Sequence, residues 1–444
     1  MSCLLHLTLW ILGVPLALAS LALGAIGVWP NAAIAIAAAI ALYLFVNSIP
    51  HLTRKKLEPG LYYVKNKFHD QLLASCAALQ PPYYKQTPWI IGGDAMTLFP
   101  FLFYQHKPID YTRRWLKVPA NFGPSPTFRR KEPPGSAPSS LKQRDTSQSQ
   151  PVDEHVALDF CFPPKGATLN TSKPFYLVLH GLNGGSSEPY VLDFVHAARS
   201  RSSGVCVLVA RGLMSTPQTT DALFHGARVS DVDTCVKALR EALPPETPLC
   251  LVGFSMGGII AANYTCQAGS ESLLASAVSI SGSFDTRTNI GFWHSRRAWQ
   301  PLLVHSLKEN FVLPYQDKVV ARGVNISQVE GVPDVVGFDK DMVAVYHEYP
   351  SLMHYYEDMS CGCGGKLKRL TTPMLAVHAM DDPIMSATGA LVKDSLAAET
   401  LTVLLTKTGG HVGFPVGWNP VKKKWSWMSG LALDYCETVV QLKK

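Results

Sequence analysis

Charged side chains are absent from the start of this 444-residue chain, whose first 53 residues contain no Asp, Glu, Lys or Arg. The apolar run Leu4–Val28 is longer than the roughly 20 residues that a helix needs to cross a bilayer. A second apolar run, Ala32–Ile49, follows the turn Trp29–Asn31. We therefore interpret residues 1–53 as a membrane anchor, first as a hairpin of two transmembrane helices and second as one tilted span.

A cleavable signal peptide is not indicated, because no basic region precedes the apolar run and the run is too long. Arg54, Lys55 and Lys56 follow it directly. The positive-inside rule then predicts that these residues, and the chain after them, face the cytosol. The expected protein is integral to a membrane, for which the endoplasmic reticulum is one candidate, with a juxtamembrane helix over residues 54–86.

Several classes of site are also missing. Only 16% of the residues are charged, the net charge is +7, and the basic residues form no stripes with interleaved aromatics, so nucleic acid is not an expected partner. There is no P-loop and no H-E-x-x-H motif, so no cofactor and no metal is predicted. The ten cysteines lack framework spacing, which is typical of a reducing compartment; Cys361 and Cys363 share a glycine loop but have no second pair to complete a metal site. The sequence does not indicate the oligomeric state.

From residue 154 onward, apolar strands alternate with helices. This alternation predicts a mostly parallel sheet with helices on both faces, within an α/β domain over residues 87–444. Two segments interrupt the domain: 121–152, rich in Pro, Ser, Gln and charge, is predicted to be a disordered insertion, and 284–370 is predicted to be a helical lid. The predicted strands are 111–118, 155–162, 175–180, 205–210, 249–254, 275–281, 374–378 and 401–406, and the predicted helices are 57–79, 189–201, 228–242, 256–268, 386–396 and 425–442.

A G-x-S-x-G motif lies where one of these strands meets a helix. The apolar strand Leu249–Val252 leads into Gly253-Phe254-Ser255-Met256-Gly257, and a helical pattern follows. This is the context of a nucleophile elbow, whose sharp turn needs small residues beside the serine. The motif alone is common by chance, and a glycine-rich turn without chemistry is the alternative. A catalytic reading therefore requires partners for Ser255.

Those partners follow in the expected order. A serine nucleophile needs a histidine base and a carboxylate that orients the base, each on a loop after a strand. The strand over 374–378 is followed by Asp381 and Asp382, and the last strand by Gly409, Gly410 and His411. We expect Ser255, Asp382 and His411 to form a catalytic triad, with Asp381 as the alternative acid.

An oxyanion hole needs two backbone N–H donors. Met256 follows the nucleophile and is expected to supply one. The glycine-rich loop after the strand over 175–180 contains Leu182, whose N–H is the expected second donor. His180 precedes this loop and is interpreted as structural, and Arg211 is expected to brace a loop through a salt bridge rather than touch substrate.

The chain resembles the YheT-like branch of the α/β-hydrolases, which includes membrane-anchored abhydrolase-domain phospholipases and esterases. The resemblance covers most of Thr87 to the C-terminus and rests on these motifs: PWIIGGDAMTLFP, HGLNGGSSEPYV, ARGLMSTPQTT, FHGARVSDV, GFSMGG, FDKDM, HYYEDMS, HAMDDPIM and GGHVGF. It implies an α/β-hydrolase fold, with a mostly parallel eight-stranded sheet and a helical lid, and the triad named above.

The expected function is hydrolysis of carboxylic esters, with phospholipids, acylglycerols or medium-chain acyl esters as the substrate class. The anchor favours lipid substrates because it would hold the site near a bilayer. Two alternatives stay open: an acyltransferase or ester synthase that uses an alcohol in place of water, and a non-catalytic scaffold with this fold.

Overall fold

The computed structural model describes residues 57–119, 154–163 and 170–443. The chain divides into a unit of residues 1–58 and a unit of residues 59–444, and the second unit is described below. The predicted anchor over 1–53 and the predicted insertion over 121–152 lie outside the described residues. Within the described ranges, no helix is both long enough and apolar enough to cross a membrane.

A nine-stranded sheet forms the centre of the unit, in the order β1-β9-β8-β7-β6-β4-β5-β3-β2. The strands from β4 to β9 pair in parallel, whereas β1, β2 and β3 pair antiparallel with their neighbours at the two edges. Their bounds are Gly60–Tyr63 (β1), Thr112–Val118 (β2), Glu154–Cys161 (β3), Phe175–Leu179 (β4), Val205–Val209 (β5), Leu249–Phe254 (β6), Ser276–Ile280 (β7), Met374–Ala379 (β8) and Leu401–Thr406 (β9).

The ninth strand corrects the prediction of an eight-stranded sheet. Residues 60–63, predicted to be part of a juxtamembrane helix over 54–86, instead form β1 against the edge of β9. The sequence Gly-Leu-Tyr-Tyr suits a strand, because aromatic residues fit a pleated surface, and the edge of β9 offers unpaired backbone groups. The helix begins only after Asn66, whose side chain accepts a hydrogen bond from the N–H of His69 as an N-cap.

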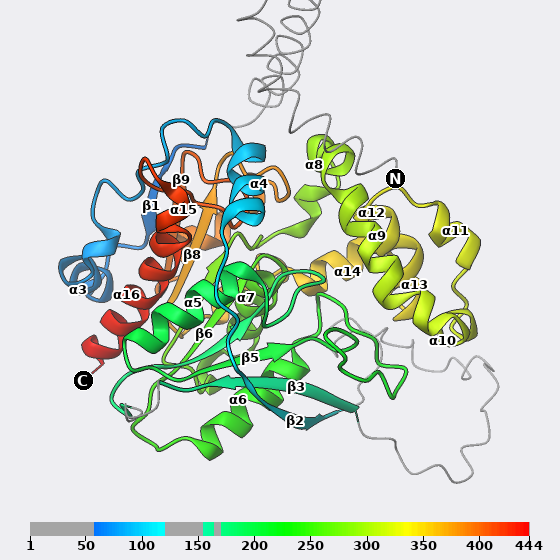
Figure 1. Ribbon diagram of the computed structural model, residues 1–444, viewed down its shortest axis with the longest axis horizontal. Helices are drawn as coiled ribbons and strands as arrows, with labels where there is room; N and C mark the ends of the chain where they lie inside the picture. Colours follow the sequence, from blue (N-terminus) through cyan, green and yellow to red (C-terminus); the bar gives the residue numbers. More distant parts are fainter. Residues whose placement is uncertain (1–56, 120–153, 164–169, 444) are drawn as a thin grey trace, which may run out of the picture. The chain divides into compact units, whose positions relative to one another are not determined.

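Helices cover both faces of the sheet (Figure 1). One face packs against α5 and α16, with α3 beside them, and the other against α6 and α7. The parallel strands are buried throughout, as expected when helices cover both faces. The bounds of these helices are Lys67–Ser75 (α3), Pro189–Ser200 (α5), Ser230–Ala242 (α6), Met256–Ala268 (α7) and Ser426–Leu442 (α16).

The segment between β7 and β8, predicted to be a lid, is helical and lies to one side of the sheet (Figure 1). Helix α4 precedes this segment in the chain, and helix α15 follows it. The bounds are Gly93–Phe103 (α4), Trp293–Ala298 (α8), Gln300–Phe311 (α9), Gln316–Ala321 (α10), Ile326–Gly331 (α11), Val335–Phe338 (α12), Ala344–Tyr346 (α13), Leu352–Met359 (α14) and Pro420–Lys423 (α15), with short turns at Ala77–Leu79 (η1), Gly269–Glu271 (η2), Thr286–Asn289 (η3), Leu313–Tyr315 (η4), Asp339–Val343 (η5) and Lys366–Arg369 (η6).

The predicted helix over 386–396 is wrong. The structure has only two short 3₁₀ turns there, Ala387–Gly389 (η7) and Lys393–Ala397 (η8). The carbonyl oxygen of Gly389 accepts hydrogen bonds from the N–H groups of Phe284 and Asp285, at 2.8 and 3.1 Å. A continuous helix would need that carbonyl for its own ladder, so a tertiary contact overrides the local pattern.

The close packing around Gly257, in the first helical turn after Ser255, predicts that two Gly→Ala variants differ strongly in stability. A Cβ at Gly257 would lie 2.3 Å from the carbonyl oxygen of Leu179 and 2.5 Å from that of His180, so the backbone of β4 would have to move. We expect Gly257→Ala to lower the free energy of unfolding by about 3 kcal/mol or more. Gly430, inside α16, has no atom within 4 Å of such a Cβ, so Gly430→Ala should stabilise the chain by up to about 1 kcal/mol.

Denaturant unfolding of the purified full chain measures both changes. Equal stability of the two variants would contradict the close approach of the elbow to β4.

Candidate active site

Ser255, the nucleophile that the motif predicts, occupies the turn between β6 and α7. Its backbone has φ 55° and ψ −118°, a strained conformation for a residue with a Cβ. Its N–H donates to the carbonyl of Ile280 at 2.8 Å, and its own carbonyl accepts from Ile259 at 3.1 Å. These bonds hold the turn in place, and Ser255 lines a cavity.

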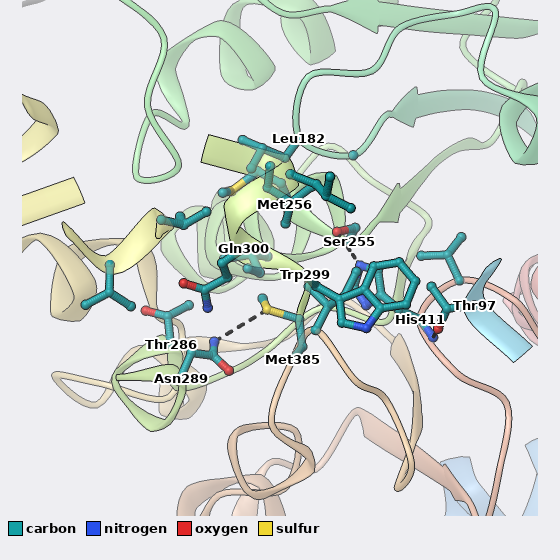
Figure 2. A pocket seen from close by; sticks show the side chains of 18 of the residues that line it. Thr97, Leu182, Ser255, Met256, Thr286, Asn289, Trp299, Gln300, Met385 and His411 are labelled. Atoms are coloured by element: carbon teal, nitrogen blue, oxygen red, sulfur yellow. Dashed lines mark hydrogen bonds between the residues drawn. The ribbon is translucent and has the colours of Figure 1, made fainter. Parts of the chain in front are cut away.

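The structure brings the three residues of the predicted triad into one hydrogen-bonded row. The Nε2 atom of His411 lies 2.7 Å from Oγ of Ser255, and its Nδ1 atom lies 2.7 Å from Oδ2 of Asp382. Figure 2 shows His411 beside Ser255 at one end of the cavity. Oδ1 of Asp382 accepts the N–H groups of Ile384 and Met385, both at 2.8 Å, so both carboxylate oxygens have partners.

The electrostatics around Asp382 favour its ionised form. Burial acts to raise the pKa of this carboxyl, but the charge of His411 and the hydrogen bond with its ring outweigh burial and hold the pKa below its usual value. A second imidazole, His378, lies 3.8 Å from Oδ2, and burial lowers the pKa of His378. His411 is thus held by an anion that fixes the orientation of its ring.

Asp381 does not contact His411. Its Oδ1 accepts the N–H of Gly410 at 2.9 Å, and its Oδ2 is buried with no hydrogen-bond partner among the described residues. Burial raises the pKa of Asp381 to about 7. Asp381 therefore holds the loop that carries His411, whereas Asp382 is the aspartate whose carboxylate lies against the ring of His411.

Helix α4 supports the same loop, a feature that the sequence patterns did not predict. The hydroxyl of Thr97 accepts the N–H of His411 at 2.7 Å and donates to the carbonyl of Gly93 at 2.7 Å. A Cβ at Gly410, where φ is 63°, would lie 2.6 Å from that same carbonyl. The motif PWIIGGDAMTLFP, at residues 88–100, contains the first part of this helix, and its presence among the motifs shared with the YheT-like branch was the one signal in the sequence.

The two expected oxyanion donors lie beside Ser255. Leu182 and Met256 both line the cavity (Figure 2), and neither N–H donates to another group in the part of the chain that the structure describes. His180 is buried, with Nε2 accepting the N–H of Ala210 at 3.1 Å and Nδ1 lying 2.7 Å from the carbonyl of Gly181. These two contacts tie His180 to the backbone at the ends of two strands, as expected of a structural residue. Burial lowers the pKa of His180.

Arg211 makes the loop-bracing contact expected of it. Its Nε donates to Oδ2 of Asp231 at 2.7 Å, and further guanidinium nitrogens donate to the carbonyls of Ala222 and Pro119. The side chain is fully buried and does not line the cavity.

The cavity above Ser255 has a volume of about 360 Å³ and walls that are mostly apolar. Helix α4 forms one wall and the helices between β7 and β8 form another. Burial raises the pKa of Glu188, which also lines the cavity and which no sequence pattern singled out. The apolar lining includes Leu98, Phe101, Leu302, Leu303, Val335, Val336 and Met359.

Comparison with known proteins finds lipases and an esterase among the relatives of this chain. A family model described as the alpha/beta hydrolase fold matches residues 176–304. A monoacylglycerol lipase of Saccharomyces cerevisiae is 31% identical over 264 residues, covering 57% of this chain and 58% of the lipase. The putative esterase YheT of Escherichia coli is 28% identical, covering 61% of this chain and 78% of YheT. The human monoacylglycerol lipase ABHD2 is 24% identical over 92% of both chains.

The match to the yeast lipase therefore spans less than two thirds of that protein, whereas the match to ABHD2 runs almost from end to end. The mostly parallel sheet, the turn at Ser255 and these relatives all indicate the same fold. The family model and the relatives support the α/β-hydrolase fold for this chain, and the relatives support the YheT-like, abhydrolase-domain branch of that superfamily.

Proposed function

We propose that this protein is a serine hydrolase that cleaves carboxylic esters of lipids, such as phospholipids, acylglycerols or medium-chain acyl esters. The hydrogen-bonded row of Ser255, His411 and Asp382 at one end of an apolar cavity is the observation that carries the proposal. The relatives named as monoacylglycerol lipases and as an esterase support the same reaction class.

The proposed reaction starts at Oγ of Ser255, which attacks the acyl carbonyl carbon while Nε2 of His411 accepts the hydroxyl proton. Asp382 stabilises the resulting imidazolium and holds its orientation. The N–H groups of Leu182 and Met256 receive the negative oxygen of the tetrahedral intermediate. His411 then returns the proton to the leaving alcohol, and water attacks the acyl-enzyme by the same steps to release the acid.

We also propose that the protein is anchored in a membrane through residues 1–53, with the catalytic domain in the cytosol. Exposed apolar side chains support a lipid environment, among them Trp89, whose ring packs against Phe99 of α4. Trp89, Ile91 and Trp418 are 47%, 81% and 79% exposed, and Nε1 of Trp89 donates to the carbonyl of Trp418 at 3.0 Å. Phe101, on α4, is 39% exposed and also lines the cavity. Exposed tryptophans of this kind are typical of proteins that contact lipid headgroups.

Alkaline extraction of native membranes tests the anchor, and protease treatment of intact vesicles tests the orientation. Integral anchoring predicts that the chain stays in the membrane pellet. Release into the supernatant would reject it, and protection of the catalytic domain inside sealed microsomes would reject the cytosolic orientation.

The products formed by the purified full chain test the reaction itself. We expect free fatty acid from a monoacylglycerol or phospholipid in detergent micelles. Adding an excess of a primary alcohol separates hydrolysis from acyl transfer, because a transferase would form the new alkyl ester at the expense of free acid. No product from a folded protein, with or without alcohol, would leave the non-catalytic scaffold as the better description.

A further inference from the structure

One part of the cavity lining is rich in polar side chains, although most of the lining is apolar. Figure 2 shows Thr286, Asn289 and Gln300 farther along the cavity than Ser255 and His411. These side chains come from the segment between β7 and β8, and none was expected to bind substrate. The polar residues from this segment that line the cavity are Thr286, Asn289, Gln300, Asp339 and Tyr356.

Three of these side chains bond to the protein itself. The hydroxyl of Thr286 bonds to the carbonyl of Tyr356 at 3.2 Å and to the hydroxyl of Ser360 at 2.9 Å. Oδ1 of Asn289 accepts the N–H of Ser386 at 2.8 Å. The hydroxyl of Tyr356 donates to Oδ2 of Asp339 at 2.9 Å. One oxygen on Gln300 and one on Asp339 accept no hydrogen bond from the described residues.

The amide of Gln300 presents its oxygen as an unused acceptor. The hydroxyl of Ser295 donates its single hydrogen to the carbonyl of Ile384 at 2.7 Å. Ser295 can therefore only accept from Gln300, whose Nε2 lies 3.2 Å away, and this fixes which amide atom is the oxygen. Oε1 has no hydrogen-bond partner among the described residues, and Gln300 is only 5% exposed. A buried acceptor without a donor costs free energy that a ligand can recover.

The carboxyl of Asp339 is similarly incomplete. It forms no ion pair within the described ranges, and Tyr356 is its only hydrogen-bond donor there. Its neighbour Asp334, in contrast, pairs with Arg296 at 2.8 Å. Burial raises the pKa of Asp339 to about 7 although the bond from Tyr356 acts to lower it. Asp339 also begins the π-helical turn η5, a distortion that occurs frequently at functional sites.

We propose that Gln300 and Asp339 form a subsite that binds hydroxyl groups of the ester substrate. The inference rests on the proposed ester hydrolysis and adds a substrate feature to it. Two oxygens without donors, on residues that line a mostly apolar cavity, fit a ligand that carries O–H groups on an apolar frame. A glycerol ester with free hydroxyls has this chemistry in its alcohol portion, and an ester of a hydroxylated fatty acid has it in its acyl portion.

Three esters with matched carbon skeletons test the subsite on the purified full chain. These are 1-decanoylglycerol, propyl decanoate, and propyl 10-hydroxydecanoate. The first and second share the acyl chain and the three-carbon alcohol, but only the first has free hydroxyls on the alcohol. The measured quantity is the ratio of kcat/KM between each hydroxylated ester and propyl decanoate, so any general loss of activity cancels.

We expect Gln300→Met, which keeps the shape of the side chain and removes the acceptor, to lower one of these ratios by about tenfold. Asp339→Asn, which can still accept from Tyr356, should lower the same ratio to a smaller extent. Gln328→Met, on the exposed helix α11, is the matched control and should leave both ratios unchanged. The ester whose ratio falls identifies the source of the hydroxyl groups.

Hydrolysis of all three esters with ratios that Gln300→Met and Asp339→Asn leave as in the wild type would overturn the subsite. Failure of the proposed function looks different, because the wild type would then cleave none of the esters and fluorophosphonate would not label it.

Discussion

Replacing Ser255 with alanine should abolish labelling by a fluorophosphonate probe and lower kcat for any ester substrate by about 10⁴-fold or more. The expectation follows from the 2.7 Å contact between Oγ of Ser255 and Nε2 of His411. Such a contact allows the imidazole to take the hydroxyl proton as the oxygen attacks phosphorus or carbon. Alanine also has a Cβ, so the variant keeps the strain already present at φ 55° and should fold.

Labelling is measured in isolated membranes that contain equal amounts of wild type and variant. Ser200→Ala is the matched control, because Ser200 is exposed on α5 and, among the described residues, its hydroxyl bonds only to the carbonyl of Ala197 in the same helix. This control should be labelled as strongly as the wild type. A folded wild type that is not labelled would contradict the proposed mechanism. Labelling that persists in Ser255→Ala would show that a different residue is the nucleophile.

The second large effect distinguishes two adjacent aspartates. Asp382→Asn should lower kcat by about 10⁴-fold, whereas Asp381→Asn should lower it by less than about tenfold. Because Oδ1 of Asp382 accepts two backbone N–H groups, the oxygen of an asparagine would take that place and its NH₂ would face Nδ1 of His411. The imidazole would then carry its proton on Nε2, where it could not accept one from Ser255.

Asp381 lacks that contact with the base. Its Oδ1 accepts the N–H of Gly410, and the oxygen of an asparagine can do the same. Steady-state kinetics on one ester, with circular dichroism to check folding, compares the two variants. A loss of similar size in both, or a larger loss in Asp381→Asn, would contradict the assignment of Asp382 as the orienting acid.

Local patterns predicted the parts of this molecule that depend on neighbours in the chain. The strand, turn and helix around Ser255 follow from an apolar run, two glycines and a helical pattern within about a dozen residues. The last strand was predicted with the bounds that the structure has, Leu401–Thr406, because a buried parallel strand is apolar throughout. The order of Ser255, Asp382 and His411, each after a strand, needed no further information, because the carboxyl ends of parallel strands share one edge of a sheet.

Contacts between distant segments decided the rest. Strand β1 exists because the edge of β9, more than 300 residues later, accepts it. The sequence patterns named Asp382 first but left Asp381 as an alternative, and the path of the His411 loop is what places Asp382 against the ring of His411. Gln300 and Asp339 lie on separate turns of the segment between β7 and β8, and their unused oxygens are recognisable only once folding brings both to one cavity. A pattern of hydrophobicity records which residues are buried, but not which buried polar group meets which, because that choice depends on side chains far apart in the chain.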